Sequence, residues 1–190
     1  MYMSLSAMAS NTSVKNADGV EIWYDFDSST KTASVTYRGS KYYSYDNEYT
    51  GEVVIPSTVT YEGEKYSVTS IGDDAFTYCS ALTSITLPES LTEIGYAAFE
   101  YCHSLTSITL PEGLTSIGNY AFYYCSALTS ITLPEGLTSI GEWTFCYCYS
   151  LTSITLPEGL TSIGDYAFYD CSALTSITLP EGVTSIGTNA

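Results

Sequence analysis

The chain has 190 residues, a formal net charge of −16 and 45% hydrophobic residues, a composition typical of a folded domain and not of a disordered chain. All five basic residues lie within the first 65 positions, and twelve carboxylates follow with no lysine or arginine. Such a negative field repels nucleic-acid backbones and anionic membranes, and no apolar run approaches the roughly 18 residues of a membrane span. The composition therefore argues against a nucleic-acid partner and against membrane insertion.

The first ten residues, "MYMSLSAMAS", contain the small-residue box Ala7-Met8-Ala9, which resembles a signal-peptidase site. We interpret residues 1–9 as the remnant of a signal peptide, with a disordered tail as the alternative. The first interpretation predicts a secreted or cell-surface protein.

The next segment, "GVEIWYDFDSSTKTASVTYRG", reads as two strands joined around Ser28-Ser29-Thr30. The alternation places Ile22, Tyr24 and Phe26 on one face of the first strand. We expect residues 10–50 to form an N-terminal β-hairpin cap over the array that follows.

Residues 51–190 are organised as a repeat. The string "LTSITLPEGLTSIG" occurs identically at Leu105, Leu128 and Leu151, with near copies at Leu82 and Leu174, so the period is 23 residues. A period of this length indicates a solenoid, in which stacked units share one core. The first turn is irregular, with a predicted hairpin insertion at residues 59–67. The last turn is incomplete, so we expect either that the natural array continues beyond Ala190 or that the uncapped C-terminal end self-associates with another chain.

Within one turn, "LTSITL" and "LTSIG" read as two extended segments separated by a Pro-Glu-Gly corner, because proline removes a ladder donor. The segment "NYAFYYC" is long enough for only one helical turn. The predicted fold is therefore a β-rich α/β solenoid, a right-handed coil of parallel strands with short helical turns. The residues expected inside are Leu105, Ile108, Leu110, Leu114, Ile117, Ala121, Phe122 and Cys125.

Five of the six cysteines fall at the same place in successive turns: Cys79, Cys102, Cys125, Cys148 and Cys171. Stacked turns would place their sulfur atoms about 4.8 Å apart. We interpret them as a structural ladder of buried thiols and not as a disulfide framework. Cys146 lies outside the ladder and is read as an isolated thiol.

The unit LxxIxLPxxLxxIGxxAFxxC closely resembles the BspA-like, or Treponema pallidum-type, class of bacterial leucine-rich repeats, over roughly residues 51–190. The resemblance implies a leucine-rich repeat fold and a secreted or surface-displayed binding protein, with some members linked to adhesion to host matrix proteins or to other bacteria. It implies no catalytic residue and no cofactor.

Variation between the repeats is concentrated around the Ala-Phe segment, so the candidate ligand-binding residues lie there: Tyr120, Trp143, Tyr166, Tyr123 and Tyr169. Exposed aromatic side chains anchor protein partners and can pack against sugar rings. The structural alternative is that they cover the turn edges. That alternative is favoured for a third column, Tyr78, Tyr101, Tyr124 and Tyr147.

Metal binding and catalysis find little support in the sequence. The glutamate after each proline gives one carboxylate per turn, which is too few for the six to eight oxygens of a calcium site. His103 is the only histidine, and its neighbour Cys102 belongs to the ladder, so no nucleophile and base pair is evident.

We therefore expect a non-catalytic, acidic binding or adhesion protein with a protein ligand, from the host matrix or a bacterial surface. A carbohydrate-binding module using the tyrosine and tryptophan columns, and a purely structural spacer, are the alternatives.

Overall fold

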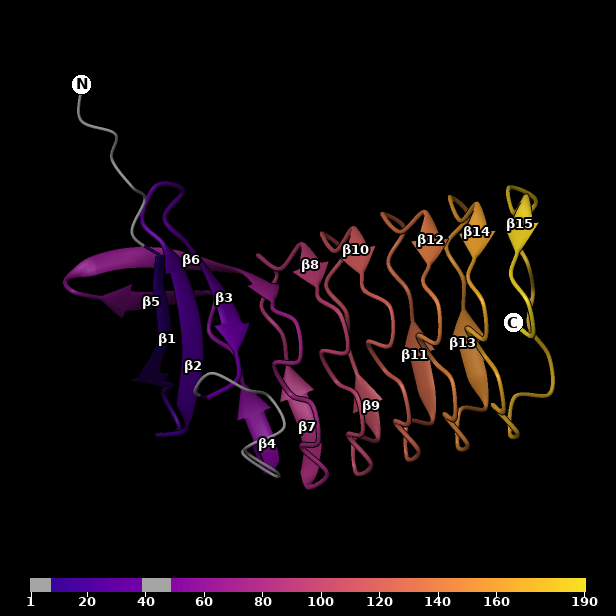
Figure 1. Ribbon diagram of the computed structural model, residues 1–190, viewed down its shortest axis with the longest axis horizontal. Coiled ribbons are helices and arrows are strands. Elements are labelled where there is room, and N and C mark those ends of the chain that lie inside the picture. Colours follow the sequence, from indigo (N-terminus) through magenta and orange to yellow (C-terminus); the bar gives the residue numbers. More distant parts are fainter. Residues whose placement is uncertain (1–7, 39–48) are drawn as a thin grey trace.

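The computed structural model describes residues 8–38 and 49–190 as a strand-rich N-terminal part followed by a column of stacked turns (Figure 1). Most of the segment interpreted as a signal peptide, residues 1–7, lies outside the described residues. The two strands of each turn form two ladders that run along the column. We call them the first and the second strand face.

The N-terminal part is built from β1 (Met8–Lys15), β2 (Glu21–Asp27) and β3 (Thr32–Thr36), which pair antiparallel in chain order. Strand β3 then pairs in parallel with β6 (Glu64–Ile71), so the sheet passes directly into the array. The side chains of Ile22, Tyr24 and Phe26 are almost fully buried. Strand β5 (Thr58–Tyr61) folds back on β6 as an antiparallel hairpin.

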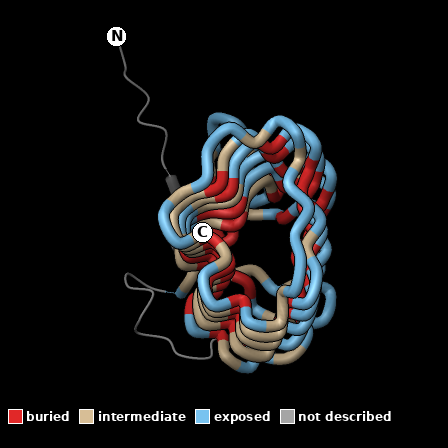
Figure 2. Tube along the Cα trace, turned by 90° about the vertical axis from the view of Figure 1, so that its right-hand side faces the viewer, coloured by how far each residue is buried: buried red, intermediate tan, exposed pale blue. Residues whose placement is uncertain are grey.

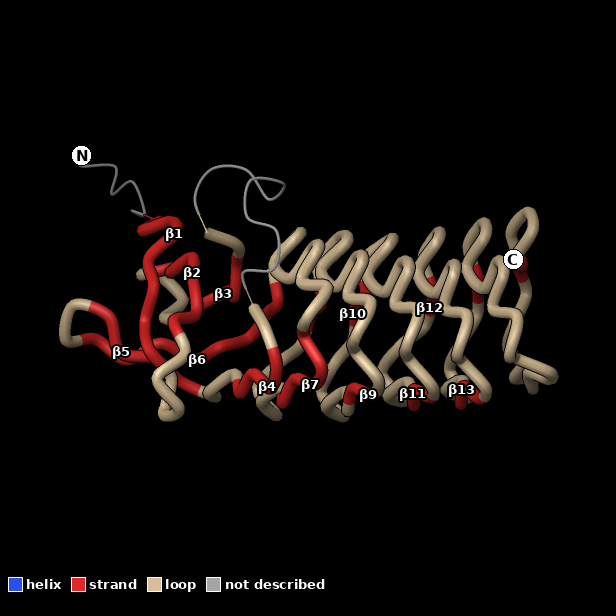
Figure 3. The backbone as a smooth tube through the Cα atoms, turned by 90° about the horizontal axis from the view of Figure 1, so that it is seen from below, coloured by secondary structure: helices blue, strands red, loops and turns tan. Residues whose placement is uncertain are grey.

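The first strand face contains β4 (Gly51–Val54), β7 (Leu82–Thr86), β9 (Ser107–Ile108), β11 (Ser130–Thr132) and β13 (Ser153–Thr155), all parallel. The second face runs from β6 through β8 (Glu93–Ile94) to β10 (Ser116–Ile117). It resumes with β12 (Ser139–Ile140), β14 (Ser162–Ile163) and β15 (Ser185–Ile186). Seen from below, the strands of the first face lie side by side along the column, from β4 to β13 (Figure 3).

The third side of each turn is not helical, which corrects the expectation of short helical turns: no helix occurs in residues 8–38 and 49–190. In the segment 72–79, Ala75, Thr77 and Cys79 donate their N–H groups to carbonyls three residues earlier, at 3.3, 3.1 and 3.0 Å. The N–H groups between them, those of Asp74, Phe76 and Tyr78, donate instead to the next turn, at 2.9, 2.8 and 2.8 Å. A helix would keep all these bonds within its own segment, whereas here half of them tie neighbouring turns together.

The buried positions recur at the same places in successive turns of the coil (Figure 2) and form one hydrophobic core along it. In the turn of β9 the apolar strand positions are buried as the alternation predicted, with Leu105 at 0%, Ile108 at 6% and Leu110 at 7% exposure. Ile117, also expected inside, is only half-buried, and Ile177, Leu179 and Ile186 of the last turn are exposed. Five phenylalanines stack along the axis with ring centroids 5.1 to 5.6 Å apart and planes within 6° of parallel: Phe76, Phe99, Phe122, Phe145 and Phe168.

Both ladders lose strand pairing between the turn of β9 and the turn of β11, and we call this an opening of the ladder. Strands β9 and β11 share a single register pair, Ser107 with Ser130, and the second face is interrupted between β10 and β12. The N–H of Leu133 reaches the carbonyl of Thr155 at 3.2 Å, but the equivalent N–H of Leu110 has no acceptor among the described residues. Each leucine is followed by a proline, so the ladder cannot continue past it.

This difference predicts the hydrogen exchange of two amides in equivalent positions. We expect the Leu110 amide to exchange much faster than the Leu133 amide, because only the second is hydrogen-bonded in the folded chain. Residue-resolved exchange measured by NMR would show it. Equal protection of the two amides would contradict the opening of the ladder.

Candidate binding surface

The aromatic residues of the third side occupy two columns with unusual backbone geometry. Tyr120, Trp143 and Tyr166 have φ angles of 62°, 58° and 54°. Tyr124 and Tyr147, each directly before a ladder cysteine, have φ angles of 59° and 60°. The left-handed region disfavours side chains with a Cβ by about 1 to 2 kcal/mol per residue. The turns require this conformation, so contacts of the rings have to offset its cost.

The first of these columns is a stack of rings. Tyr120 lies 5.8 Å from Trp143 with planes 6° apart, and Trp143 lies 4.2 Å from Tyr166 with planes 13° apart. Tyr96 extends the column toward the N-terminus, with its ring 5.5 Å from that of Tyr120. Aromatic pairs of this kind contribute about 0.5 to 1.5 kcal/mol each beyond their buried area.

Tyr123 joins the two columns. Its ring contacts Tyr120 and Trp143 on one side and Tyr101 and Tyr147 on the other, at centroid distances of 5.5 to 6.2 Å. Two turns later, Tyr169 makes an equivalent bridge between Tyr166 and Tyr147. The rings therefore form one continuous surface, the aromatic face: Tyr78, Tyr96, Tyr101, Tyr120, Tyr123, Tyr124, Trp143, Tyr147, Tyr149, Tyr166 and Tyr169.

The exposure of these rings is uneven. Tyr78, Tyr96 and Tyr169 are 38%, 48% and 42% exposed, while Tyr120, Trp143 and Tyr166 are half-buried. Because the rings of the stacked column turn their faces toward one another, they present edges and hydroxyl groups to solvent. The aromatic face therefore offers hydrogen bonds and ring edges, but few free ring faces.

In the other turns, the place within the repeat that Tyr123 and Tyr169 occupy is taken by Thr77, Glu100 and Cys146, which have different environments. Thr77 is buried and donates its hydroxyl to the carbonyl of Ala97 at 2.7 Å. Cys146 is fully buried, and burial raises the pKa of its thiol to about 12. Glu100 is half-buried at the N-terminal end of the aromatic face.

Glu100 and Asp74 have raised pKa values. Burial, followed by the charge of Asp74, raises the pKa of Glu100 to about 7. Burial, followed by the charge of Asp73, raises the pKa of Asp74 to about 6, against a weaker opposing hydrogen bond from the hydroxyl of Thr77. Two half-desolvated carboxylates thus adjoin the aromatic face.

These shifts predict a stability that falls as the pH rises. The unfolded chain releases both protons near pH 4, whereas the folded chain holds them until about pH 6 to 7, so the free energy of unfolding decreases across this window. Glu100→Gln should gain stability over the parent chain, with a gain that grows from pH 5 to pH 8. Urea unfolding at both pH values measures it. A gain independent of pH would contradict the raised pKa.

The ladder cysteines are buried, and four of them make the same contact. The thiols of Cys102, Cys125, Cys148 and Cys171 donate to the carbonyl of the phenylalanine 26 residues earlier, at 3.2, 3.2, 3.3 and 3.1 Å. All six cysteines are free. Each S–H group thus ties one turn to the Phe column of the turn before it.

Burial should make these thiols unreactive. Because desolvation raises the pKa of Cys102, Cys125 and Cys148 well above the usual range, little thiolate forms at neutral pH. We expect a thiol reagent to label almost no cysteine in the native protein and six after denaturation. Fewer than six labelled thiols in the denatured, unreduced protein would indicate disulfides.

Side chains in alternate turns make inter-turn hydrogen bonds that were not predicted from the sequence. Asp73, Asn119 and Asp165 follow a glycine, and each accepts the backbone N–H of the residue one turn later, at 2.7, 3.0 and 2.6 Å. A Cβ at the glycine one turn later, such as Gly95, would collide with this carboxylate. The signal was present, since an Asp or Asn follows the glycine in every second repeat.

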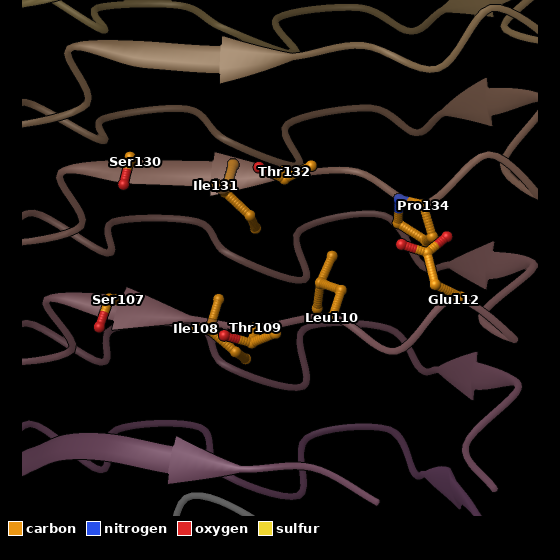
Figure 4. A pocket seen from close by; sticks show the side chains of 9 residues that line it. All are labelled: Ser107, Ile108, Thr109, Leu110, Glu112, Ser130, Ile131, Thr132 and Pro134. Atoms are coloured by element: carbon orange, nitrogen blue, oxygen red, sulfur yellow. The ribbon is translucent and has the colours of Figure 1, made fainter. Parts of the chain in front are cut away.

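A second surface feature lies on the first strand face, where the ladder opens between β9 and β11. The space between the two turns is about 300 Å³ and is lined by Ser107, Ile108, Thr109, Leu110, Glu112, Ser130, Ile131, Thr132 and Pro134 (Figure 4). We call it the strand-end groove. Figure 4 shows the carboxylate of Glu112 beside Pro134, at one end of the groove.

Within the described residues, no three histidine, cysteine or acidic side chains gather into a group that could hold a metal ion. Likewise, the described part of the chain contains no helix that could span a membrane.

The two ladders of parallel strands, the 23-residue turn and its leucine positions define a leucine-rich repeat solenoid. The model of the BspA type leucine rich repeat region matches residues 40–148 and 69–190, in six copies. The chain therefore belongs to the BspA-type leucine-rich repeat family. A comparison with curated proteins finds no match.

Several solved structures are similar. A leucine rich cell surface protein from Faecalibacterium prausnitzii A2-165 is 33% identical, with a TM-score of 0.64 over 95% of this chain and 52% of that one. A leucine-rich repeat protein from Bacteroides ovatus ATCC 8483 is 29% identical, with a TM-score of 0.60 over 87% and 54%. The T. pallidum leucine rich repeat protein is 28% identical, with a TM-score of 0.69 over 92% and 86%. The chain spans about half the length of the first two.

Proposed function

We propose that this chain is a non-catalytic binding module of a secreted or cell-surface protein, and that it binds another protein through the aromatic face. The observation that carries the proposal is the continuity of this face: Tyr123 and Tyr169 link two columns of rings whose edges reach the surface. Tyrosine and tryptophan are the residues on which protein interfaces most often depend. Family membership and the described cell-surface relative support the surface location.

The ring geometry favours a protein over a glycan as the ligand. A sugar packs its C–H groups against the face of an aromatic ring, and in the stacked column each inner face is covered by the next ring. A protein partner can use ring edges and tyrosine hydroxyls as well as faces. The tyrosines with greater exposure, Tyr96 and Tyr169, are where a glycan would bind if that alternative holds.

The test needs a partner found by parallel screens of matrix proteins, bacterial surface proteins and glycans. Replacing Tyr120, Trp143 and Tyr166 together by Ser should weaken binding at least a hundredfold, because three central anchors typically contribute more than 1 kcal/mol each. The exposed pair Thr129→Ser and Thr152→Ser, on the first strand face, is the matched control and should leave binding unchanged. Denaturant unfolding must remain cooperative in both variants.

Unchanged binding by the aromatic variant would refute the aromatic face as the site. Inhibition by millimolar free sugar would support the carbohydrate alternative. A chain that binds nothing in any screen would favour a structural spacer.

A further inference from the structure

The strand-end groove between β9 and β11 recurs along the first strand face. A second groove of about 220 Å³ lies one turn earlier, and a third of about 520 Å³ lies two turns later. All three occur where a leucine N–H, that of Leu87, Leu110 or Leu156, has no acceptor among the described residues. The same opening thus occurs three times along this face, and the turn of Leu133, with the same strand sequence, is closed.

The grooves also share their lining. In the central one, Leu110 and Ile131 form an apolar floor, the threonines at the strand ends carry hydroxyls, and Glu112 lies at one end (Figure 4). Glu89 occupies the equivalent place in the earlier groove, and Glu158 with Glu181 in the later one. Glutamates are the only ionisable residues that line these three grooves.

No cation of the array balances these carboxylates, since no lysine or arginine follows Lys65. Carboxylates about 5 Å apart in successive turns repel one another by roughly 1 kcal/mol per pair in water. A bound cation would remove this repulsion. Each groove of the first strand face is therefore partly apolar and has an unbalanced negative charge at one end.

We propose that these grooves receive lysine or arginine side chains from an extended basic segment of a partner protein. The aliphatic stem lies on the leucine and isoleucine floor, and the ammonium or guanidinium group reaches the glutamate. The site is distinct from the aromatic face, because it lies on the first strand face and not on the third side of the turn. It does not depend on the proposed role of that face.

A single groove binds weakly, since an exposed ion pair contributes at most about 1 kcal/mol. Several grooves along one face act together, because a second side chain of the same segment binds at a high effective concentration. The affinity should therefore rise steeply with the number of basic residues in the segment.

The probe is a twelve-residue peptide of alternating lysine and serine, titrated into the full chain and followed by calorimetry and by the Leu110 amide signal in NMR. The variant Glu89→Gln, Glu112→Gln, Glu158→Gln should bind it at least tenfold more weakly. The control Glu62→Gln, Glu93→Gln, Glu142→Gln removes the same charge from exposed sites outside the grooves, leaving −13 in both variants. It should bind as the parent chain does.

A second peptide carries the same charges on side chains shortened by two methylene groups, is compared at about pH 6 where both kinds of amine are protonated, and should bind several-fold more weakly because the short stem does not fill the groove. Equal losses in the two glutamine variants, or equal binding of the two peptides, would refute the groove and leave only the general negative field. No binding of the lysine peptide to the parent chain would also refute it. The Tyr120, Trp143 and Tyr166 variant should bind the peptide normally, which separates this test from that of the aromatic face.

Discussion

The contact between one turn and the next is the constraint on which this structure depends. A turn of 23 residues has two short strands and a third side without regular structure, so it cannot enclose a core alone. Stacking supplies what one turn lacks: the phenylalanine column fills the axis, and four of the five ladder thiols reach the carbonyl of a phenylalanine in the preceding turn. The N–H groups of the third side alternate between their own turn and the next. Surface side chains at equivalent places in the repeat therefore lie one above another, separated by the distance between two stacked turns.

Stacking also explains why the two candidate surfaces differ. On the third side, the left-handed residues of successive turns lie above one another, and large rings at these positions pack into a continuous face. On the first strand face, the side chains are small and identical from turn to turn, so the surface is shaped by where the ladder closes. The hydrogen bond of Leu133 holds two turns together, and its absence at Leu110 leaves a groove.

Much of the fold was predictable because a repeat states the same pattern several times. The leucine and isoleucine positions, the phenylalanine and the family resemblance all followed from "LTSITLPEGLTSIG" and "AFxxC". The segment around Phe122 was predicted to be helical and is not, because half of its N–H groups donate to the next turn. An inter-turn bond has no signal within a single turn. For Asp73, Asn119 and Asp165 the signal was their recurrence in every second repeat, and the stacked turns give its meaning: each side chain accepts an N–H of the next turn.

The sequence by itself determined the period, the inward residues and the acidic array, since each depends on residue type at a fixed spacing. It also identified Tyr120, Trp143 and Tyr166 as a varying column. Only the tertiary structure decided that these rings stack face to face, that Tyr123 joins them to the neighbouring column, and that the strand ladder opens beside Glu112. These features arise from distances between different turns, and the order of residues within one turn does not fix them.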